Sequence, residues 1–215
     1  MTISWLGLSC FEITTKTSAG EAKIVIDPYD NATGLRFPRT LEADALLSSH
    51  NDSDANNFSA VSGQPFIIKS PGEYEVKDVF FFALSAPAKV GEDQTSPNLI
   101  FRLEAEQMNL AHLGALNREL TDQETEQMQN VDILMIPVGG HRVMSAKTAA
   151  SVVAQIEPRI IIPMTYDLPN LKEKLEAVDD FNKELRVFRR ESSNKYKVTR
   201  KDLPEEETII MILER

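Results

Sequence analysis

Cysteine is almost absent from this chain of 215 residues, since Cys10 is the only one. A single cysteine excludes an intrachain disulfide and a zinc cluster built from several thiolates. Histidine is scarce as well: the chain has three, His50, His112 and His141. Any metal site that uses imidazole ligands therefore depends on these positions.

Positive charge and long hydrophobic runs are also lacking. Lys and Arg number 23 against 33 Asp and Glu, which gives a formal charge of -10 and excludes a general nucleic-acid surface, because phosphate backbones require clustered basic residues. The first residues, MTISWLGLSCFEI, offer neither a positive lead nor an apolar segment long enough for a signal peptide or a transmembrane helix. We expect no membrane partner and a cytoplasmic protein.

The remaining composition is that of a globular protein. Hydrophobic residues make up 42% and charged residues 26% of the chain, and its length suits one large core. There is no internal repeat and no low-complexity segment. We predict a single domain over residues 1–215.

Short apolar runs bounded by Gly, Pro, Asn and Asp dominate the first half and predict strands. They lie at 3–7, 10–15, 22–28, 43–49, 64–70, 78–85, 98–105 and 107–114. The second half alternates, with strands at 131–140 and 159–166 and helices at 145–158 and 168–185, before two final strands at 186–190 and 208–214. Strands followed by strand–helix alternation predict a layered α/β sandwich.

The stretch SSHNDSDANN follows one of these apolar runs and has the order of an H-x-H-x-D-H metal box. In such a box a strand delivers the first histidine to a sheet edge, and the next turn brings alternate side chains to one ion. Here the second and last histidines are Asp52 and Ala55, whereas His50 and Asp54 are present. Without further context, the favoured interpretation is that His50 is satisfied by a backbone group and that the two aspartates are ordinary turn or helix-capping residues.

Several segments resemble the metallo-β-lactamase fold superfamily, in particular its branch of small bacterial Zn-dependent hydrolase-like proteins. They are SWLGLSCFEI, IVIDPYD, SSHNDSDANN, SPGEYEV, AHLGALNRELTDQE, VDILMIPVGG and QIEPRIIIPMTYDLP, in the family's order. The resemblance implies a four-layer αββα sandwich with a metal site along one edge of the two sheets.

The resemblance also assigns metal positions. The first ion of the family is held by three histidines, which correspond to His50, Asp52 and His112 in this chain. The second ion's ligands correspond to Asp54, Ala55 and Thr165. The carboxylate that bridges the ions corresponds to Ala115, and the histidine of a G-H-S element corresponds to Leu8. The loss of these donors excludes a two-ion hydrolase, which needs both cations to activate one water.

Two functions remain open. The first is a non-catalytic pseudoenzyme that binds or scaffolds an unknown small molecule or protein. The alternative is a mononuclear metal-dependent hydrolase with His50, Asp52 and His112 as ligands, and with Asp54 as a general base that also belongs to the metal-site set. The predicted cofactor is accordingly either none or one weakly bound divalent metal, zinc first. Oligomerisation and a substitute ligand role for His141 are left open.

Overall fold

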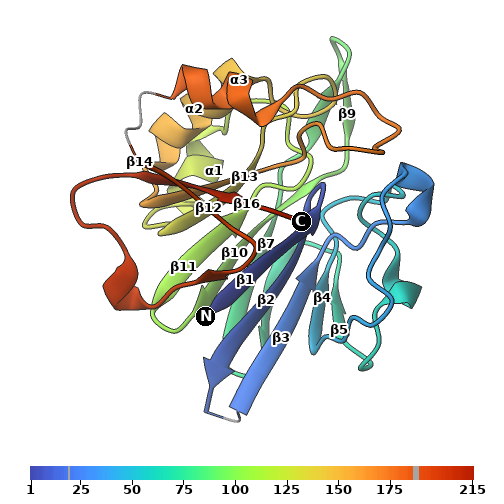
Figure 1. The fold of residues 1–215 in the computed structure, drawn as a ribbon, viewed down its shortest axis with the longest axis vertical. Coiled ribbons are helices and arrows are strands. Elements are labelled where there is room, and N and C mark those ends of the chain that lie inside the picture. Colours follow the sequence, from blue (N-terminus) through green and yellow to red (C-terminus); the bar gives the residue numbers. More distant parts are fainter. Residues whose placement is uncertain (19, 186–188) are drawn as a thin grey trace.

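The computed structural model describes residues 1–18, 20–185 and 189–215. It shows two β-sheets stacked face to face, with helices against the outer side of the larger sheet (Figure 1). The six-stranded sheet has the order β15 (Tyr196–Lys197), β1 (Thr2–Gly7), β2 (Cys10–Thr17), β3 (Gly20–Ile26), β4 (Ala45–Leu47), β5 (Phe66–Ile68). The eight-stranded sheet has the order β14 (Arg189–Ser193), β16 (Ile209–Leu213), β13 (Ile160–Met164), β12 (Ile133–Pro137), β11 (Met108–His112), β10 (Leu99–Ala105), β7 (Val79–Ser85), β6 (Gly72–Val76). A hairpin of β8 (Ala88–Val90) and β9 (Gln94–Ser96) stands apart. The α-helices are α1 (Asp122–Gln127), α2 (Ala146–Ile156) and α3 (Val178–Glu184).

The main hydrophobic core lies between the two sheets and under the helices. It joins side chains of β1 and β2, such as Trp5 and Phe11, to side chains of the larger sheet, such as Phe101. Strands β12 and β13 are buried at every position, as expected for central parallel strands covered on both faces. The predicted α/β sandwich is therefore confirmed.

The outer face of the six-stranded sheet is covered by loops rather than by a long helix. A second apolar cluster lies there and includes Val25, Tyr29 and Leu46. Its cover includes two 3₁₀ turns, η1 (Asn31–Thr33) and η2 (Phe58–Ala60). The fourth layer of the sandwich is thus built mainly of irregular backbone.

The helix predicted over 168–185 is wrong for its first ten positions, because α3 covers only Val178–Glu184. The preceding segment is a loop in which Asp167 N–H bonds to Glu176 O at 2.9 Å, and Asn170 has a left-handed φ of 71°. Leu175, which has helical spacing, packs into the second apolar cluster instead. Of the strand predicted at 186–190, residues 186–188 lie outside the described part of the chain, and the last two begin β14.

The parallel strands of both sheets end at one edge of the sandwich. β3 and β4 are parallel neighbours in one sheet, and β11, β12 and β13 in the other. Thr165 N–H, after β13, donates to Leu8 O in the β1–β2 turn at 3.1 Å, which ties the two sheets together there. The carboxyl ends of such strands are the usual place for a site in open α/β sheets. Among the described residues, no helix is long and apolar enough to cross a membrane.

Candidate metal centre

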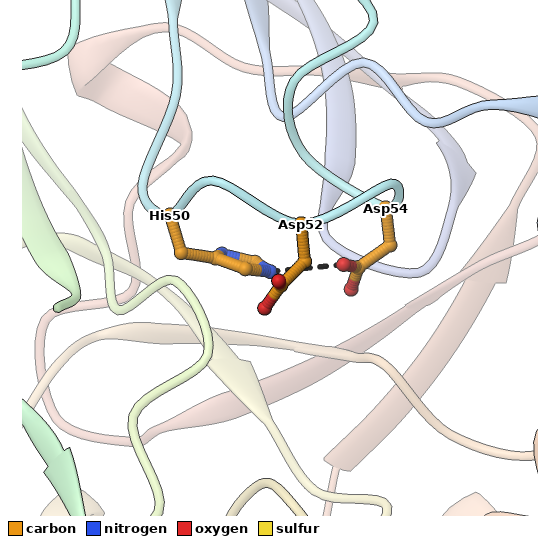
Figure 2. Close-up of side chains that lie close together, drawn as sticks. All are labelled: His50, Asp52 and Asp54. Carbon is orange, nitrogen blue, oxygen red and sulfur yellow. Dashed lines mark hydrogen bonds and ion pairs between the residues drawn. The ribbon is translucent and has the colours of Figure 1, made fainter. Parts of the chain in front are cut away.

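Three side chains that could hold a cation lie together on the loop that follows β4. They are His50, Asp52 and Asp54, and their potential ligand atoms all lie within 4.8 Å of one another (Figure 2). Ala55 N–H donates to Asp52 O at 3.0 Å, which closes a turn within the loop. His50 and Asp54 are buried, whereas Asp52 is exposed. The loop therefore presents one nitrogen and two carboxylates at the edge of a solvent-accessible pocket.

The imidazole of His50 is held at both nitrogens. Ser49 donates from its backbone N–H and from its hydroxyl to the buried carboxylate of Asp27, each at 2.6 Å. Because the hydroxyl hydrogen is used in this way, Ser49 Oγ must accept from His50 Nδ1, which lies 2.8 Å away. This leaves Nε2, 3.0 Å from Asp54 Oδ1, as the nitrogen that faces the carboxylates.

His50 and Asp54 form a buried ion pair. Burial lowers the pKa of His50, but the hydrogen bond and the charge of Asp54 outweigh it, so the net pKa is raised. Burial raises the pKa of Asp54, yet the hydrogen bond with His50 and the charges of His50 and Arg142 bring it down to about 2. Asp54 is therefore a carboxylate at neutral pH, and a cation is required beside it.

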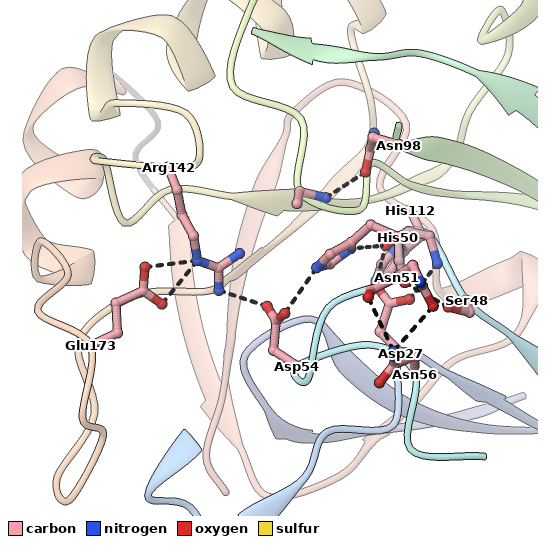
Figure 3. A network of polar contacts seen from close by, with 12 residues as sticks. Asp27, Ser48, His50, Asn51, Asp54, Asn56, Asn98, His112, Arg142 and Glu173 are labelled. Atoms are coloured by element: carbon pink, nitrogen blue, oxygen red, sulfur yellow. Dashed lines mark hydrogen bonds and ion pairs between the residues drawn. The ribbon is translucent and has the colours of Figure 1, made fainter. Parts of the chain in front are cut away.

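That cation is partly supplied by Arg142, which follows the Gly139–Gly140 pair after β12. Arg142 Nη2 lies 2.6 Å from Asp54 Oδ2, and its Nε lies 2.7 and 2.9 Å from the two oxygens of Glu173 (Figure 3). Glu173 comes from the loop that was expected to be a helix. Neither Arg142 nor Glu173 was identified from the sequence, because nothing local to either of them indicates that they meet Asp54.

His112 lies outside the group formed by His50 and the two aspartates. It is fully buried, its Nε2 donates to Ser9 O at 2.9 Å, and its Nδ1 accepts from Gly114 N–H at 3.2 Å. Burial lowers the pKa of His112, in agreement with a neutral ring that uses both nitrogens. Its Nε2 is 4.0 Å from Asp27 Oδ2, so it lies behind His50, next to the carboxylate that orients Ser49 (Figure 3).

The other positions assigned by resemblance carry no donor suited to a second ion. Ala55 and Thr165 are fully enclosed, and the backbone N–H of Ala115 donates to Asn98 Oδ1 at 2.8 Å. Thr165 Oγ1 has no hydrogen-bond partner among the described residues. His141 is exposed and does not line the pocket beside Asp52 and Asp54.

That pocket has a volume of about 390 Å³. Its walls combine charged and apolar groups and are formed by Leu8, Thr33, Asp52, Ser53, Asp54, Arg142, Leu171, Lys172 and Glu173. A second pocket of about 420 Å³ is lined by His50, together with Phe58 and Lys69. Asp52 and Asp54 thus line one pocket and His50 lines the other.

A fold of two stacked sheets with a histidine–aspartate loop at one edge defines the metallo-β-lactamase class. Residues 2–165 match the model of the beta-lactamase superfamily domain, so the chain belongs to this family. A UPF0173 protein of Pyrococcus furiosus is 27% identical over 88% of this chain and 92% of its own length. A UPF0173 metal-dependent hydrolase of Thermoplasma acidophilum is 24% identical over 77% of this chain and 83% of its own. A crystal structure from Thermotoga maritima, described as a candidate Zn-dependent hydrolase of the metallo-β-lactamase superfamily, superimposes with a TM-score of 0.79 at 29% identity, covering 99% of this chain and 98% of that one.

These findings correct one expectation. The preference for a non-catalytic binding or scaffolding protein is wrong: relatives across most of the chain are named metal-dependent hydrolases, and a His–Asp–Asp group is retained. The pseudoenzyme interpretation rested in part on the missing histidine at position 52, although the carboxylate of Asp52 can itself bind a metal ion. The expected bacterial branch has no support from the curated relatives, which are archaeal.

Proposed function

We propose that the chain is a metal-dependent hydrolase that works with one divalent metal ion, held by His50, Asp52 and Asp54. The observation that carries the proposal is the convergence of these donors within 4.8 Å. One imidazole nitrogen and two carboxylates are a donor set that suits zinc, and an open coordination position would remain for substrate. Zinc is our first choice of metal.

The residues of the chain fit one ion and not two. A divalent ion in this group would act as a Lewis acid and lower the pKa of a water molecule. A second ion would meet Ala55, Ala115 and Thr165, which supply no charge, and would compete with the guanidinium of Arg142 for Asp54. The hydrolase is therefore proposed as mononuclear.

Asp54 is better suited to holding the cation than to removing a proton. A general base works best when its pKa lies near the working pH, whereas the pKa of Asp54 is about 2. Asp52 is the exposed member of the group and lines the pocket. In this arrangement His112 is a neutral ring whose nitrogens bond to Ser9 O and Gly114 N–H.

An alternative ligand set consists of His50, Asp52 and His112, which the resemblance assigns to the first ion. It would require His112 to give up its 2.9 Å contact with Ser9 O. His112→Ala and Asp54→Ala separate the two sets: our proposal expects the larger loss of zinc affinity in Asp54→Ala. His141→Ala is the matched histidine control, since His141 is exposed.

The function is tested on the purified chain by elemental analysis and by hydrolysis of ester, thioester and phosphodiester substrates. We expect about one metal per chain and a metal-dependent activity that is lost in His50→Ala and Asp52→Ala and kept in Asp93→Ala, which changes an exposed carboxylate of the β8–β9 hairpin. A chain that takes up no zinc, manganese or iron at neutral pH would refute the proposal.

A further inference from the structure

Among the described residues, the guanidinium of Arg142 has hydrogen-bond partners at two of its three nitrogens. Its Nε is bound by Glu173 and its Nη2 by Asp54. Within the described ranges, Nη1 makes no hydrogen bond (Figure 3). The side chain is 33% exposed and lines the 390 Å³ pocket. A rigidly held guanidinium thus keeps free N–H donors at a site that a ligand can reach.

The guanidinium of Arg142 also lies beside the group that is proposed to hold the metal ion. It lies against Asp54 Oδ2, on the carboxylate that the resemblance assigns to the second ion. A guanidinium cannot be lost by dilution or chelation and carries its charge at all relevant pH values. A permanent cation therefore stands beside the proposed ion, where substrate oxygens would be stabilised.

The charges of the pocket depend on whether the metal ion is present. Three carboxylates, of Asp52, Asp54 and Glu173, face two cations, of Arg142 and Lys172. These five side chains together carry one net negative charge, which a divalent ion would change to one net positive charge. Leu8 and Leu171 supply an apolar wall beside these groups. Such a pocket favours a ligand with an apolar body and one anionic end.

We infer that Arg142 recognises an oxyanion of the substrate, a carboxylate or a phosphate, beside the metal ion. This inference rests on the proposed function, because the anion is favoured only when the ion is bound. Arg142 would bind through Nη1 while Asp54 and Glu173 hold the plane of its guanidinium. It is thereby a specificity-determining residue of the site.

The test measures binding rather than turnover. Benzoate and phenyl phosphate share an apolar ring and differ in their anionic end, so calorimetric titration of the zinc-loaded chain with each distinguishes the two sources of oxyanion. Arg142→Gln should weaken the preferred probe about tenfold or more, the loss expected for one charge-assisted hydrogen bond. Arg189→Gln is the matched control, since Arg189 lies in β14 between Glu191 and Glu207, and it should bind as the parent does.

Glu173→Gln provides a variant with the opposite expected sign. It removes a competing negative charge but keeps the arginine, so affinity for the same probe should rise, by about threefold if the charge contributes as an exposed pair does. Glu207→Gln is its control and should change nothing. Because Glu173 is a partly exposed loop residue with a side chain 36% exposed, this variant is expected to fold.

The outcomes separate the inference from the function on which it rests. A parent chain that binds no metal refutes the proposed function and the inference together. A loaded parent whose affinity for both probes is unchanged by Arg142→Gln overturns the inference alone. If Arg142→Gln fails to fold or to load, Glu173→Gln decides, and unchanged or weaker binding in that variant overturns the inference.

Discussion

Asp27 is the residue that sets the hydrogen-bonding direction of the candidate site. Its carboxylate is fully buried and accepts both the backbone N–H and the hydroxyl of Ser49. This leaves the Ser49 oxygen to accept from His50 Nδ1, so that the neutral imidazole presents a free lone pair at Nε2. Asp27, which is not one of the proposed metal ligands, thus determines which nitrogen of His50 can bind a cation.

Asp27→Asn should therefore weaken metal binding while leaving the shape of the site intact. The new amide would donate to Ser49 Oγ, the hydroxyl would turn toward His50 Nδ1, and the proton of the neutral ring would move to Nε2. We expect zinc affinity, measured by competition with a chromogenic chelator, to fall about ten- to a hundredfold, as for other partners of ligating histidines. Asp44→Asn is the control, because Asp44 accepts a backbone N–H from Lys23 at 2.9 Å before β4. Equal affinity in Asp27→Asn and the parent would show that Asp27 does not orient the ring.

Sequence reasoning identified the residues that follow a local pattern and missed those that depend on long-range contacts. His50, Asp52 and Asp54 share one loop and one motif, and the structure brings them together. Arg142 and Glu173 reach the same site from 88 residues away and a further 31 residues on, so no spacing rule could pair them. His112 was assigned to the site from a motif, but its hydrogen bonds to Ser9 and Gly114 could not be predicted from the sequence.

At the scale of elements, most strands were predictable because their apolar runs are bounded by turn residues. The strands β6, β8, β9 and β15, which lack such a run, and two helical segments were not predicted. The helix expected from Leu171 and Leu175 does not form there, because Lys172 N–H donates to Thr33 O and Glu176 N–H donates to Gly139 O instead. Helix α1 has little apolar periodicity, yet the sequence carries its start signal: Thr121 and Glu124 form a capping box. A short helix fixed by its cap rather than by its apolar face escapes a search for periodicity.

The turn after β11 is an element where three segments meet without spare room. Gly114 has a φ of 59°, and a Cβ placed on it would lie 2.4 Å from Asn98 Oδ1 and 2.6 Å from Ser49 Cβ. Gly114→Ala should lower the free energy of unfolding by about 2–4 kcal/mol, because it adds the left-handed backbone cost to overpacking. Gly91→Ala is the matched control, with a φ of 74° and nothing within 4 Å; it should lose only about 1–2 kcal/mol. Equal losses in urea denaturation would mean that the turn has room to relax.

The stability that Glu124 contributes through the cap of α1 should depend on pH. Glu124 accepts from Thr121 N–H at 2.9 Å and from two nitrogens of Arg118 at 2.7 and 2.8 Å. Burial raises the pKa of Glu124, but these bonds outweigh it and lower the pKa below 4.5. A carboxylate with a depressed folded pKa stabilises the protein above its unfolded pKa, and the contribution is lost as the pH falls through the folded value.

Glu124→Gln should therefore be less stable than the parent at pH 7, and the difference should shrink as the pH falls below 4.5, the unfolded reference value. Denaturant titrations at a series of pH values measure this difference. Glu126→Gln, an exposed change in the same helix, should show no such dependence. A difference that stays constant into acid would mean that the charge of Glu124 is not what holds the cap.

At the scale of the whole molecule, the core joins the beginning of the chain to its end. The main apolar cluster contains Met1 as well as Leu213, and Arg215 Nε donates to Leu6 O at 2.8 Å. The proposed ligands share one loop after β4 of the six-stranded sheet, but Asp54 pairs with Arg142, which follows β12 of the eight-stranded sheet, so the complete site forms only when the sheets are stacked. Folding and metal binding should for this reason be coupled.

We therefore predict that the chain unfolds in one cooperative transition, as a single domain over residues 1–215, and that zinc shifts this transition upward. A ligand that binds only the folded state at a hundred times its Kd stabilises it by about 2.7 kcal/mol, which for a chain of this size raises Tm by roughly 5–10 °C. His50→Ala should retain the single transition and lose the shift, whereas His141→Ala should retain both. Calorimetry with and without zinc checks this. Two separate transitions would refute the single domain, and a shift that persists in His50→Ala would place the bound ion elsewhere on the molecule.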